Sequence, residues 1–99
     1  MKRLVIVEDE PYMADYLVNY IDWEKIGVTI EAVEDNGKDG LAVIEKLCPD
    51  IVITDIKMPQ MDGITMIKSI IKDGLDIKFV ILSSHSEFHM VKEAFRLGI

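Results

Sequence analysis

Hydrophobic residues gather in four short runs along the chain, and each run is followed by a segment with helical spacing. The runs cover residues 3–7, 28–33, 51–54 and 77–82, and their short length and many β-branched side chains predict strands. The run at 51–54 is apolar up to its last position, which is typical of a central parallel strand covered on both faces. The run at 28–33 alternates only weakly, so we expect it at an edge of the sheet with one face toward water.

The segments after these runs predict helices, the first over roughly residues 11–22. Its first turn accommodates Pro11, and the second and third helices end at Pro49 and Gly74. Gly40 lies inside the second helix, where we expect it to cost about 1 kcal/mol relative to alanine. The expected apolar face of the first helix consists of Tyr12, Met13, Tyr16, Leu17, Tyr20 and Ile21, and that of the second consists of Leu41, Ile44 and Leu47 or Cys48. The third helix is expected to present Ile64, Ile67, Ile70 and Ile71, and the fourth Phe88, Val91, Ala94 and Phe95. Ser84 or Ser86 is the expected cap of the fourth helix.

Strands and helices therefore alternate in the order βαβαβαβα. Short connections and right-handed crossovers predict a doubly wound, parallel α/β sheet with helices on both faces. The chain has 99 residues, which fits one domain around one hydrophobic core. The sequence shows no repeat, low-complexity tract or linker that would divide it.

Composition and charge exclude several classes of protein. Hydrophobic residues make up 49% of the chain, which excludes a disordered tail. The formal net charge is −7 and the 11 basic residues are scattered, so we expect no nucleic-acid-binding surface on this chain. No apolar stretch approaches the ~18 residues of a membrane span, and no signal-peptide core follows Lys2 and Arg3. The single cysteine, Cys48, cannot form an internal disulfide, and we expect it to be a buried small hydrophobic residue in a cytoplasmic protein.

Polar side chains capable of chemistry follow three of the predicted strands. Glu8 and Asp9 follow the first, Asp55 ends the third and Ser83 follows the fourth. In a doubly wound sheet the carboxyl ends of the strands share one edge, where such folds carry their sites. Three acids gathered there would repel one another by about 4 kcal/mol per pair at ~4 Å and an effective dielectric of ~20, and a divalent cation would relieve this. The donors are all oxygen, which favours Mg²⁺ or Mn²⁺ over Zn²⁺.

A carboxylate beside Mg²⁺ can attack phosphorus and hold the phosphoryl group as an acyl phosphate, which makes Asp55 the candidate nucleophile. Ser83 could bind a phosphoryl oxygen, and the backbone carbonyl of Lys57 could reach the metal if the chain curls after Asp55. Met58 favours that curl because Pro59 pushes it into an extended conformation. Taken singly, the acids at 8–10 fit a solvated loop, and Asp55 fits a turn or helix cap. Their coincidence at strand ends favours a site.

Three motifs carry a resemblance to a known family. They are Val-Glu-Asp-Glu-Pro at 7–11, Thr-Asp-Ile-Lys-Met-Pro-Gln-Met-Asp-Gly at 54–63 and Ile-Leu-Ser-Ser at 81–84. Together they resemble the receiver domain of bacterial two-component response regulators, and the likeness runs over residues 2–99. The resemblance implies a flavodoxin-like (CheY-like) fold with the strand order 2-1-3-4, and a phosphohistidine on a sensor histidine kinase as the phosphoryl donor.

The same resemblance implies a role for each candidate site residue. Asp55 would be the phosphoacceptor and would also ligate Mg²⁺. Asp9 would be a direct metal ligand, Glu8 would act through water, and Lys57 would supply a carbonyl oxygen. Ser83 would be the hydroxyl that closes on the phosphoryl group and switches the domain.

The family's pattern also extends past this chain, because receiver domains carry a fifth strand with a phosphate-binding lysine and a fifth helix. We therefore expect residues 1–99 to be a C-terminally incomplete receiver domain whose phosphorylation is impaired. The strand at 77–82 would be an open apolar edge, which predicts a homodimer or an exchange of segments. Residues 20–24 and 86–88 are similar to the subgroup with an AraC-type output, so DNA would be bound only through an absent C-terminal domain.

The leading interpretation is a signalling module that does not turn over substrate. Two other classes of function are the alternatives to it. An Mg²⁺-dependent phosphohydrolase with an aspartate nucleophile places a second acid two residues after the first, and Lys57 occupies that position here. A nucleotide-binding protein would carry a glycine-rich phosphate loop after a strand, and none follows any predicted strand. Asp62 fits the cap of the third helix better than a metal ligand.

Overall fold

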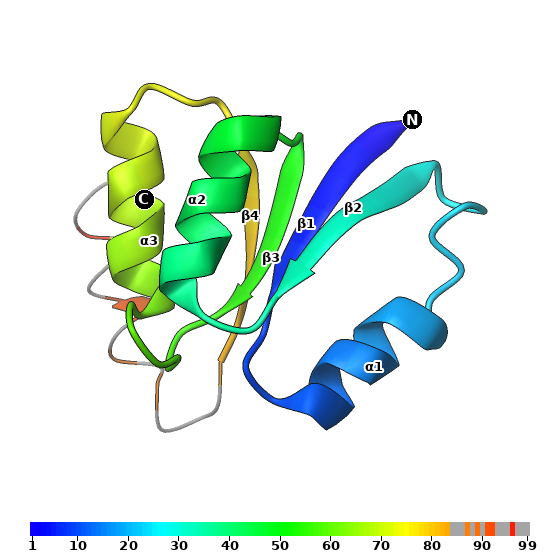
Figure 1. Ribbon diagram of the computed structural model, residues 1–99, viewed down its shortest axis with the longest axis horizontal. Coiled ribbons are helices and arrows are strands. Elements are labelled where there is room, and N and C mark those ends of the chain that lie inside the picture. The colour runs from blue at the N-terminus through cyan, green and yellow to red at the C-terminus, as the bar shows by residue number, and fades with distance from the viewer. Residues whose placement is uncertain (84–86, 88, 90, 93–95, 97–99) are drawn as a thin grey trace.

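The computed structural model describes residues 1–83, 87, 89, 91, 92 and 96, which form a parallel four-stranded sheet with helices on both faces (Figure 1). The strands lie in the order β2-β1-β3-β4, as predicted. The elements are β1 (Lys2–Val7), α1 (Pro11–Asn19), β2 (Val28–Glu34), α2 (Gly37–Leu47), β3 (Ile51–Asp55), α3 (Gly63–Lys72) and β4 (Lys78–Leu82). Most of the predicted fourth helix lies outside the described residues. None of the helices in the part of the chain that is described is long and apolar enough to cross a membrane.

Strand β1 is the centre of the core because both of its faces are covered. Its residues from Leu4 to Val7 are all 0% exposed, and successive side chains point to opposite faces of the sheet. On one face the buried cluster, covered by α2 and α3, consists of Val5, Val7, Ile44, Val52, Met66, Ile70 and Ile77. On the other face, below α1, it consists of Leu4, Ile6, Leu17, Val28 and Ile53.

Helix α1 buries much less than its sequence pattern predicts. Leu17 is its one buried residue, whereas Tyr12, Tyr16 and Tyr20 are 86%, 55% and 78% exposed. The predicted apolar face is therefore wrong for the tyrosines, which recur every four residues along a line of the helix that faces water. The rings of Tyr16 and Tyr20 stack with centroids 5.0 Å apart. A tyrosine side chain tolerates partial exposure to solvent because its hydroxyl group is polar. The helix also ends at Asn19 rather than near residue 22.

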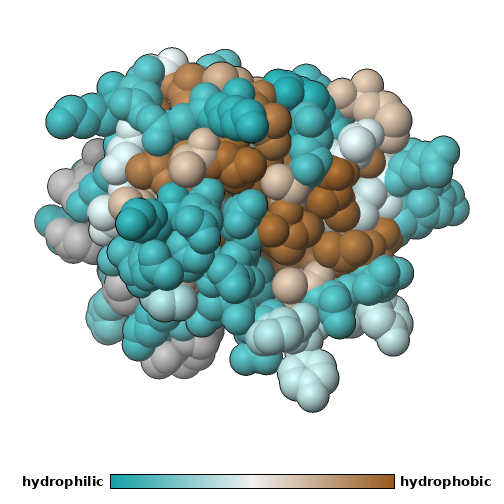
Figure 2. Space-filling view, viewed as in Figure 1, coloured by the Kyte–Doolittle hydropathy of each residue, from teal (hydrophilic) through white to brown (hydrophobic). Residues whose placement is uncertain are grey.

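Strand β4 forms one edge of the sheet, as the position of the last strand predicts. Val80 in its middle is 48% exposed. Figure 2 shows further hydrophobic residues at the surface in the middle of the visible face, between the helices, within a mostly hydrophilic surround. Self-association through β4 stays a prediction.

Arg3 ties the C-terminal end of α2 to the sheet. Its guanidinium donates hydrogen bonds to the carbonyl oxygens of Leu47, at 2.8 Å, and of Cys48, and it forms an ion pair with Glu31 at 3.1 Å. The Arg3 backbone N–H donates to Asp50 at 2.8 Å, and this bond lowers the pKa of that carboxyl. Arg3 therefore satisfies carbonyls that a helix end leaves without partners.

Cys48 is exposed, so the prediction of a buried cysteine is wrong. The reason is that α2 ends at Leu47 and Cys48 is its C-cap, in a left-handed conformation with φ of 46°. That conformation turns the side chain away from the buried face of the helix.

Gly40 has a packing role that its helix propensity does not reveal. A Cβ atom at this position would lie 2.9 Å from both Cγ atoms of Val7 and 3.1 Å from the sulfur of Met66. The absence of a side chain therefore lets α2 approach β1 closely. The lower helix propensity of glycine at position 40 is therefore the cost of the close approach between α2 and β1.

We expect Gly40→Ala to lower the free energy of unfolding by about 1–2 kcal/mol, because overpacking outweighs the ~1 kcal/mol gain in helix propensity. Urea unfolding followed by the fluorescence of Trp23 measures this change. Ala42→Gly, at an exposed position of the same helix, serves as the control and should cost about 1 kcal/mol from propensity alone. A more stable Gly40→Ala variant would contradict the close approach of α2 to β1.

We expect Arg3→Ala to cost about 1–2 kcal/mol, because two carbonyl oxygens at the end of α2 lose their donor. Arg3→Lys should recover only part of this, since an ammonium group lacks the planar fork that serves both carbonyls. The exposed neighbour Lys2, changed to alanine, is the matched control. The same unfolding assay checks the three variants, and equal stability of Arg3→Lys and the unchanged chain would refute the bridging role.

Candidate functional site

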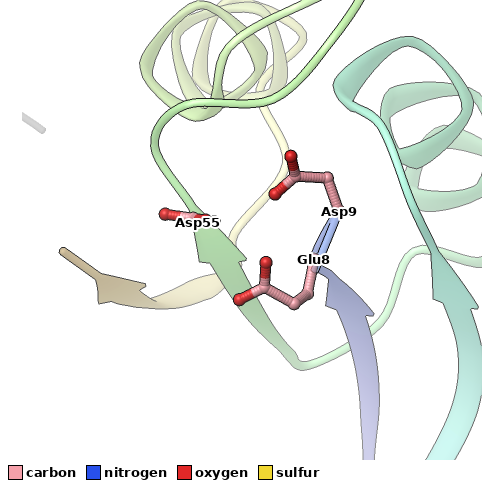
Figure 3. Close-up of side chains that lie close together, drawn as sticks. All are labelled: Glu8, Asp9 and Asp55. Atoms are coloured by element: carbon pink, nitrogen blue, oxygen red, sulfur yellow. The ribbon is translucent and has the colours of Figure 1, made fainter. Parts of the chain in front are cut away.

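Three carboxylates converge where β1 and β3 end. The two strands are paired in parallel with Val7 beside Thr54, so the next residues along each strand, Glu8 and Asp55, leave the sheet at the same level. Asp9 follows Glu8, and one carboxylate oxygen of each of the three residues lies within 4.8 Å of the others. Figure 3 shows Glu8 and Asp9 projecting from the end of β1 beside Asp55. The structure thus brings together the acids that the sequence places at separate strand ends.

Local hydrogen bonds hold these acids in place. The backbone N–H of Ile56 donates to Oδ1 of Asp55 at 2.7 Å, and that of Glu10 donates to Oε2 of Glu8 at 3.0 Å. The chain then folds back, because the N–H of Gly63 donates to the carbonyl of Ile56 at 2.7 Å. A Cβ atom on Gly63 would lie 2.1 Å from the carbonyl oxygen of Asp55, so only glycine fits there. The start of α3 therefore packs directly on the candidate nucleophile.

Burial shapes the electrostatics of the site. Glu8 is only 4% exposed, and this burial raises its pKa from 4.5 to about 7, with the nearby Asp55 charge adding to the shift. Burial also raises the pKa of Asp55. The hydrogen bond from Ile56 opposes that rise, and the charges of Glu87 and Asp9 add to it. The site therefore holds a proton more tightly than isolated carboxylates do.

Two hollows flank the acids and share Glu8. The first, of about 300 Å³, is lined by Glu8, Met13, Asp55, Leu82, Ser83 and Glu87. The second, of about 430 Å³, is lined by Glu8, Asp9, Pro11, Ala14, Asp15, Val33, Glu34 and Asp35. Because β3 lies between β1 and β4, Asp55 has Glu8 on one side and Ser83 on the other.

The structure also places the remaining residues that the sequence singles out. Ser83 is exposed and lines the first hollow with Asp55, while the side chain of Lys57 is exposed beyond β3. Asp62 is the N-cap of α3, as predicted, and its Oδ1 accepts from the N–H of Thr65 at 2.8 Å. Glu87 was missed, although its position four residues after Ser83, just past a strand end, is a signal that could have found it.

The donor set indicates which ligand the acids can hold. Three carboxylates around one point, with no Cys or His among the described residues that line the hollows, suit a hard divalent cation such as Mg²⁺. A cation there would offset the repulsion that burial strengthens. Asp55 borders the 300 Å³ hollow, so its carboxylate can reach a group that enters from solvent.

Comparison with known proteins agrees with this arrangement. The family model described as the response regulator receiver domain matches residues 4–99. The chain is 34% identical over 99 residues to the transcriptional regulatory protein YesN of Bacillus subtilis, covering 100% of this chain and 27% of that protein. It is 36% identical over 97 residues to the chemotaxis protein CheY of Thermotoga maritima, covering 98% of this chain and 79% of that protein.

A solved structure supports the same conclusion. The DNA-binding response regulator of the LuxR family from Staphylococcus aureus superposes with a TM-score of 0.88 at 30% identity, covering 100% of this chain and 82% of that one. The chain thus matches one part of these regulators, and it spans only about a quarter of YesN. On the evidence of its sequence motifs, its sheet order and these matches, the chain belongs to the response regulator receiver domain family.

Proposed function

We propose that this chain is the phosphoacceptor module of a two-component system and that Asp55 accepts the phosphoryl group. The observation that supports this most strongly is the convergence of Glu8, Asp9 and Asp55 within 4.8 Å at the ends of two paired strands. The proposed donor is a phosphohistidine on a sensor histidine kinase. The proposed cofactor is Mg²⁺, held by Asp9, Asp55 and the carbonyl of Lys57, with Glu8 acting through water.

The residues of the chain would divide the work of phosphoryl transfer. An oxygen of Asp55 forms a bond to phosphorus while the bond from phosphorus to the donor's imidazole nitrogen breaks, and the imidazole, protonated on its other ring nitrogen, leaves as a neutral molecule with the electron pair. The N–H of Ile56 holds Oδ1 of Asp55 and so fixes the direction of the carboxylate. Ser83, exposed at the hollow, donates its hydroxyl to a phosphoryl oxygen. Bound Mg²⁺ would neutralise negative charge on the transferring group.

The output of this module would lie in another part of the full-length protein. YesN is a transcriptional regulatory protein, and the chain corresponds to 27% of its length. The net charge of −7 and the scattered basic residues argue against a DNA-binding surface on this chain. We therefore propose that phosphorylation of Asp55 controls a DNA-binding domain, with an AraC-type domain as the prediction from the sequence at 20–24 and 86–88.

The alternative of a phosphohydrolase lacks support among the residues around Asp55. Lys57, two residues on, cannot serve as the second acid of such enzymes, and its side chain is exposed. A signalling role requires only one transfer per molecule, and a hydrolase requires turnover. Measured turnover therefore separates the two functions.

We expect Mg²⁺ and acetyl phosphate to phosphorylate the chain at Asp55 alone, slowly and to less than one group per chain because its phosphorylation is expected to be impaired, and Asp55→Asn to abolish the addition. Intact-mass and peptide mass spectrometry check both expectations. Asp62→Asn makes the same chemical change at the cap of α3, and it should leave labelling intact. Labelling that persists in Asp55→Asn, or sustained hydrolysis of p-nitrophenyl phosphate by the unchanged chain, would rule out the proposed function.

Glu8 makes the stability of the metal-free chain depend on pH. Its pKa of about 7 in the folded state lies above the ordinary 4.5, so between these values the folded state binds a proton that the unfolded state releases. The stability contributed by that proton is present at low pH and is lost as the pH rises through this window. Asp55, whose pKa is also raised, adds a change of the same sign.

We therefore expect the melting temperature of the metal-free chain to fall between about pH 5 and about pH 8, and Glu8→Gln to reduce this fall. At about pH 8, Glu8→Gln should melt higher than the unchanged chain without Mg²⁺ and gain less from added Mg²⁺. Differential scanning fluorimetry across this range measures both effects. If Glu8→Gln had the same pH profile of the melting temperature and the same rise with Mg²⁺ as the unchanged chain, Glu8 would neither cause the pH dependence nor contribute to metal binding.

A further inference from the structure

Thr54, the residue before the proposed phosphoacceptor, places a polar hydroxyl in the hydrophobic core. Its side chain is 0% exposed, and it lies beside Val7 of the paired strand β1. Alternation along β3 puts it on the same face as Val52, the face covered by α2 and α3. These two neighbours are valines, and valine has the shape of threonine without the polar oxygen. Packing alone therefore does not explain the hydroxyl.

The hydroxyl bonds to the peptide group that follows Asp55. Oγ1 of Thr54 donates to the carbonyl oxygen of Asp55 at 2.8 Å. The N–H of Ile56, at the other end of the same peptide group, donates to Oδ1 of Asp55 at 2.7 Å. A peptide group is planar and rigid, so these two hydrogen bonds fix opposite ends of one plane. Thr54 is therefore coupled to the Asp55 carboxylate through a single rigid unit.

The surroundings of this peptide plane restrict its position. A Cβ atom on Gly63 would lie 2.1 Å from the carbonyl oxygen of Asp55, so the start of α3 crowds that oxygen. The side chain of Ile56 is 0% exposed, and its carbonyl accepts from the N–H of Gly63 at 2.7 Å. These contacts limit the space around the plane. The Thr54 hydroxyl adds a directional bond, which selects one orientation within that space.

We propose that Thr54 is a positioning residue for phosphoryl transfer, because its hydroxyl sets the peptide plane through which the Ile56 N–H orients the Asp55 carboxylate. This inference rests on the proposed function of Asp55 as a phosphoacceptor. Thr54 is fully buried, so it acts through Asp55 and does not contact the donor. A carboxylate that leaves its direction of attack transfers phosphoryl more slowly, since small errors of alignment cost large factors in rate.

Two substitutions separate the hydroxyl of Thr54 from its shape. Thr54→Val keeps the shape and removes the hydroxyl, and Thr54→Ser keeps the hydroxyl and removes a methyl group. The reaction measured is transfer from acetyl phosphate with saturating Mg²⁺. An oxygen of Asp55 bonds to phosphorus, the bond from phosphorus to the acetate oxygen breaks, and acetate leaves with the electron pair.

We expect Thr54→Val to slow the initial phosphorylation of Asp55 about threefold to tenfold relative to the unchanged chain, as measured by mass spectrometry. Thr54→Ser should stay within about twofold of the unchanged rate, because it retains the donor that fixes the peptide plane. Rescue by serine separates the hydroxyl bond from the packing of the methyl group.

The amide signal of Ile56 reports the same coupling without any phosphoryl transfer. A strong hydrogen bond to a carboxylate moves the proton signal of an amide downfield. In proton–nitrogen correlation spectra of the metal-free chain, we expect this signal to move upfield in Thr54→Val and to keep its position in Thr54→Ser. The amide of Thr65, which donates to Asp62 at 2.8 Å, is the internal reference and should not move.

A matched control separates positioning from a loss of stability. Ile70→Val removes one methylene group from the core on the same face of the sheet. It lowers the melting temperature without removing a hydrogen bond. It should leave both the rate of phosphorylation and the Ile56 signal unchanged, and thermal melting confirms that each variant folds.

The outcomes separate this inference from the function on which it rests. If Asp55 of the unchanged chain accepts no phosphoryl group, the proposed function fails and the role of Thr54 fails with it. If Asp55 is phosphorylated but Thr54→Val keeps the unchanged rate, or Thr54→Ser is as slow as Thr54→Val, only the role of Thr54 is overturned. An Ile56 signal that stays in place in Thr54→Val, or an equal loss of rate in Ile70→Val, would overturn it as well.

Discussion

The pairing of β1 with β3 holds three mutually repelling carboxylates at one point, and the other features of the site depend on it. The register places Val7 beside Thr54, so Glu8 and Asp55 emerge together with Asp9 next to them. Burial of the hydrophobic β1 residues on both faces stabilises that register, because a slip of one residue would turn each side chain to the wrong face. The energy of the hydrophobic core thus opposes the repulsion at the edge of the sheet.

This balance explains why the site responds to charge. Burial raises the pKa of Glu8 to about 7, so near neutral pH a proton and the proposed metal ion would compete for the same carboxylates. A phosphoryl group on Asp55 would change the charge again, at the hollow that Ser83 and Glu87 border. Because the stability of the domain depends on the charge of the site, each bound proton, metal ion or phosphoryl group would shift the balance between its conformations. Such a dependence suits a signalling module.

The sequence predicts the fold because its signals are local and agree with one another. Apolar runs, Pro49 and Gly74 separate the elements, and the parallel order follows from short crossovers. The meeting of Glu8, Asp9 and Asp55 was predictable for the same reason, since carboxyl ends of parallel strands share an edge. The receiver family, inferred from three motifs, is confirmed by the match over residues 4–99.

Features that depend on packing between distant segments were not predictable. Helical spacing marked Tyr12 and Tyr20 as apolar, but nothing local shows that the line they follow on α1 faces water. Cys48 was expected to be buried, and the left-handed end of α2 exposes it. The role of Gly40 appears only when α2 lies against Val7, and the position of Glu87 beside Asp55 appears only when the hollow is formed.

We propose above all that Glu8, Asp9 and Asp55 form a magnesium site at which Asp55 receives the phosphoryl group. A crystal structure with Mg²⁺ and beryllium fluoride, an analogue of the phosphoryl group, tests it most directly. We expect the beryllium fluoride group to be bound to Asp55, within reach of the Ser83 hydroxyl, and the metal to be bound by Asp9 and Asp55. A metal bound elsewhere, with Asp55 carrying no fluoride group, would contradict it.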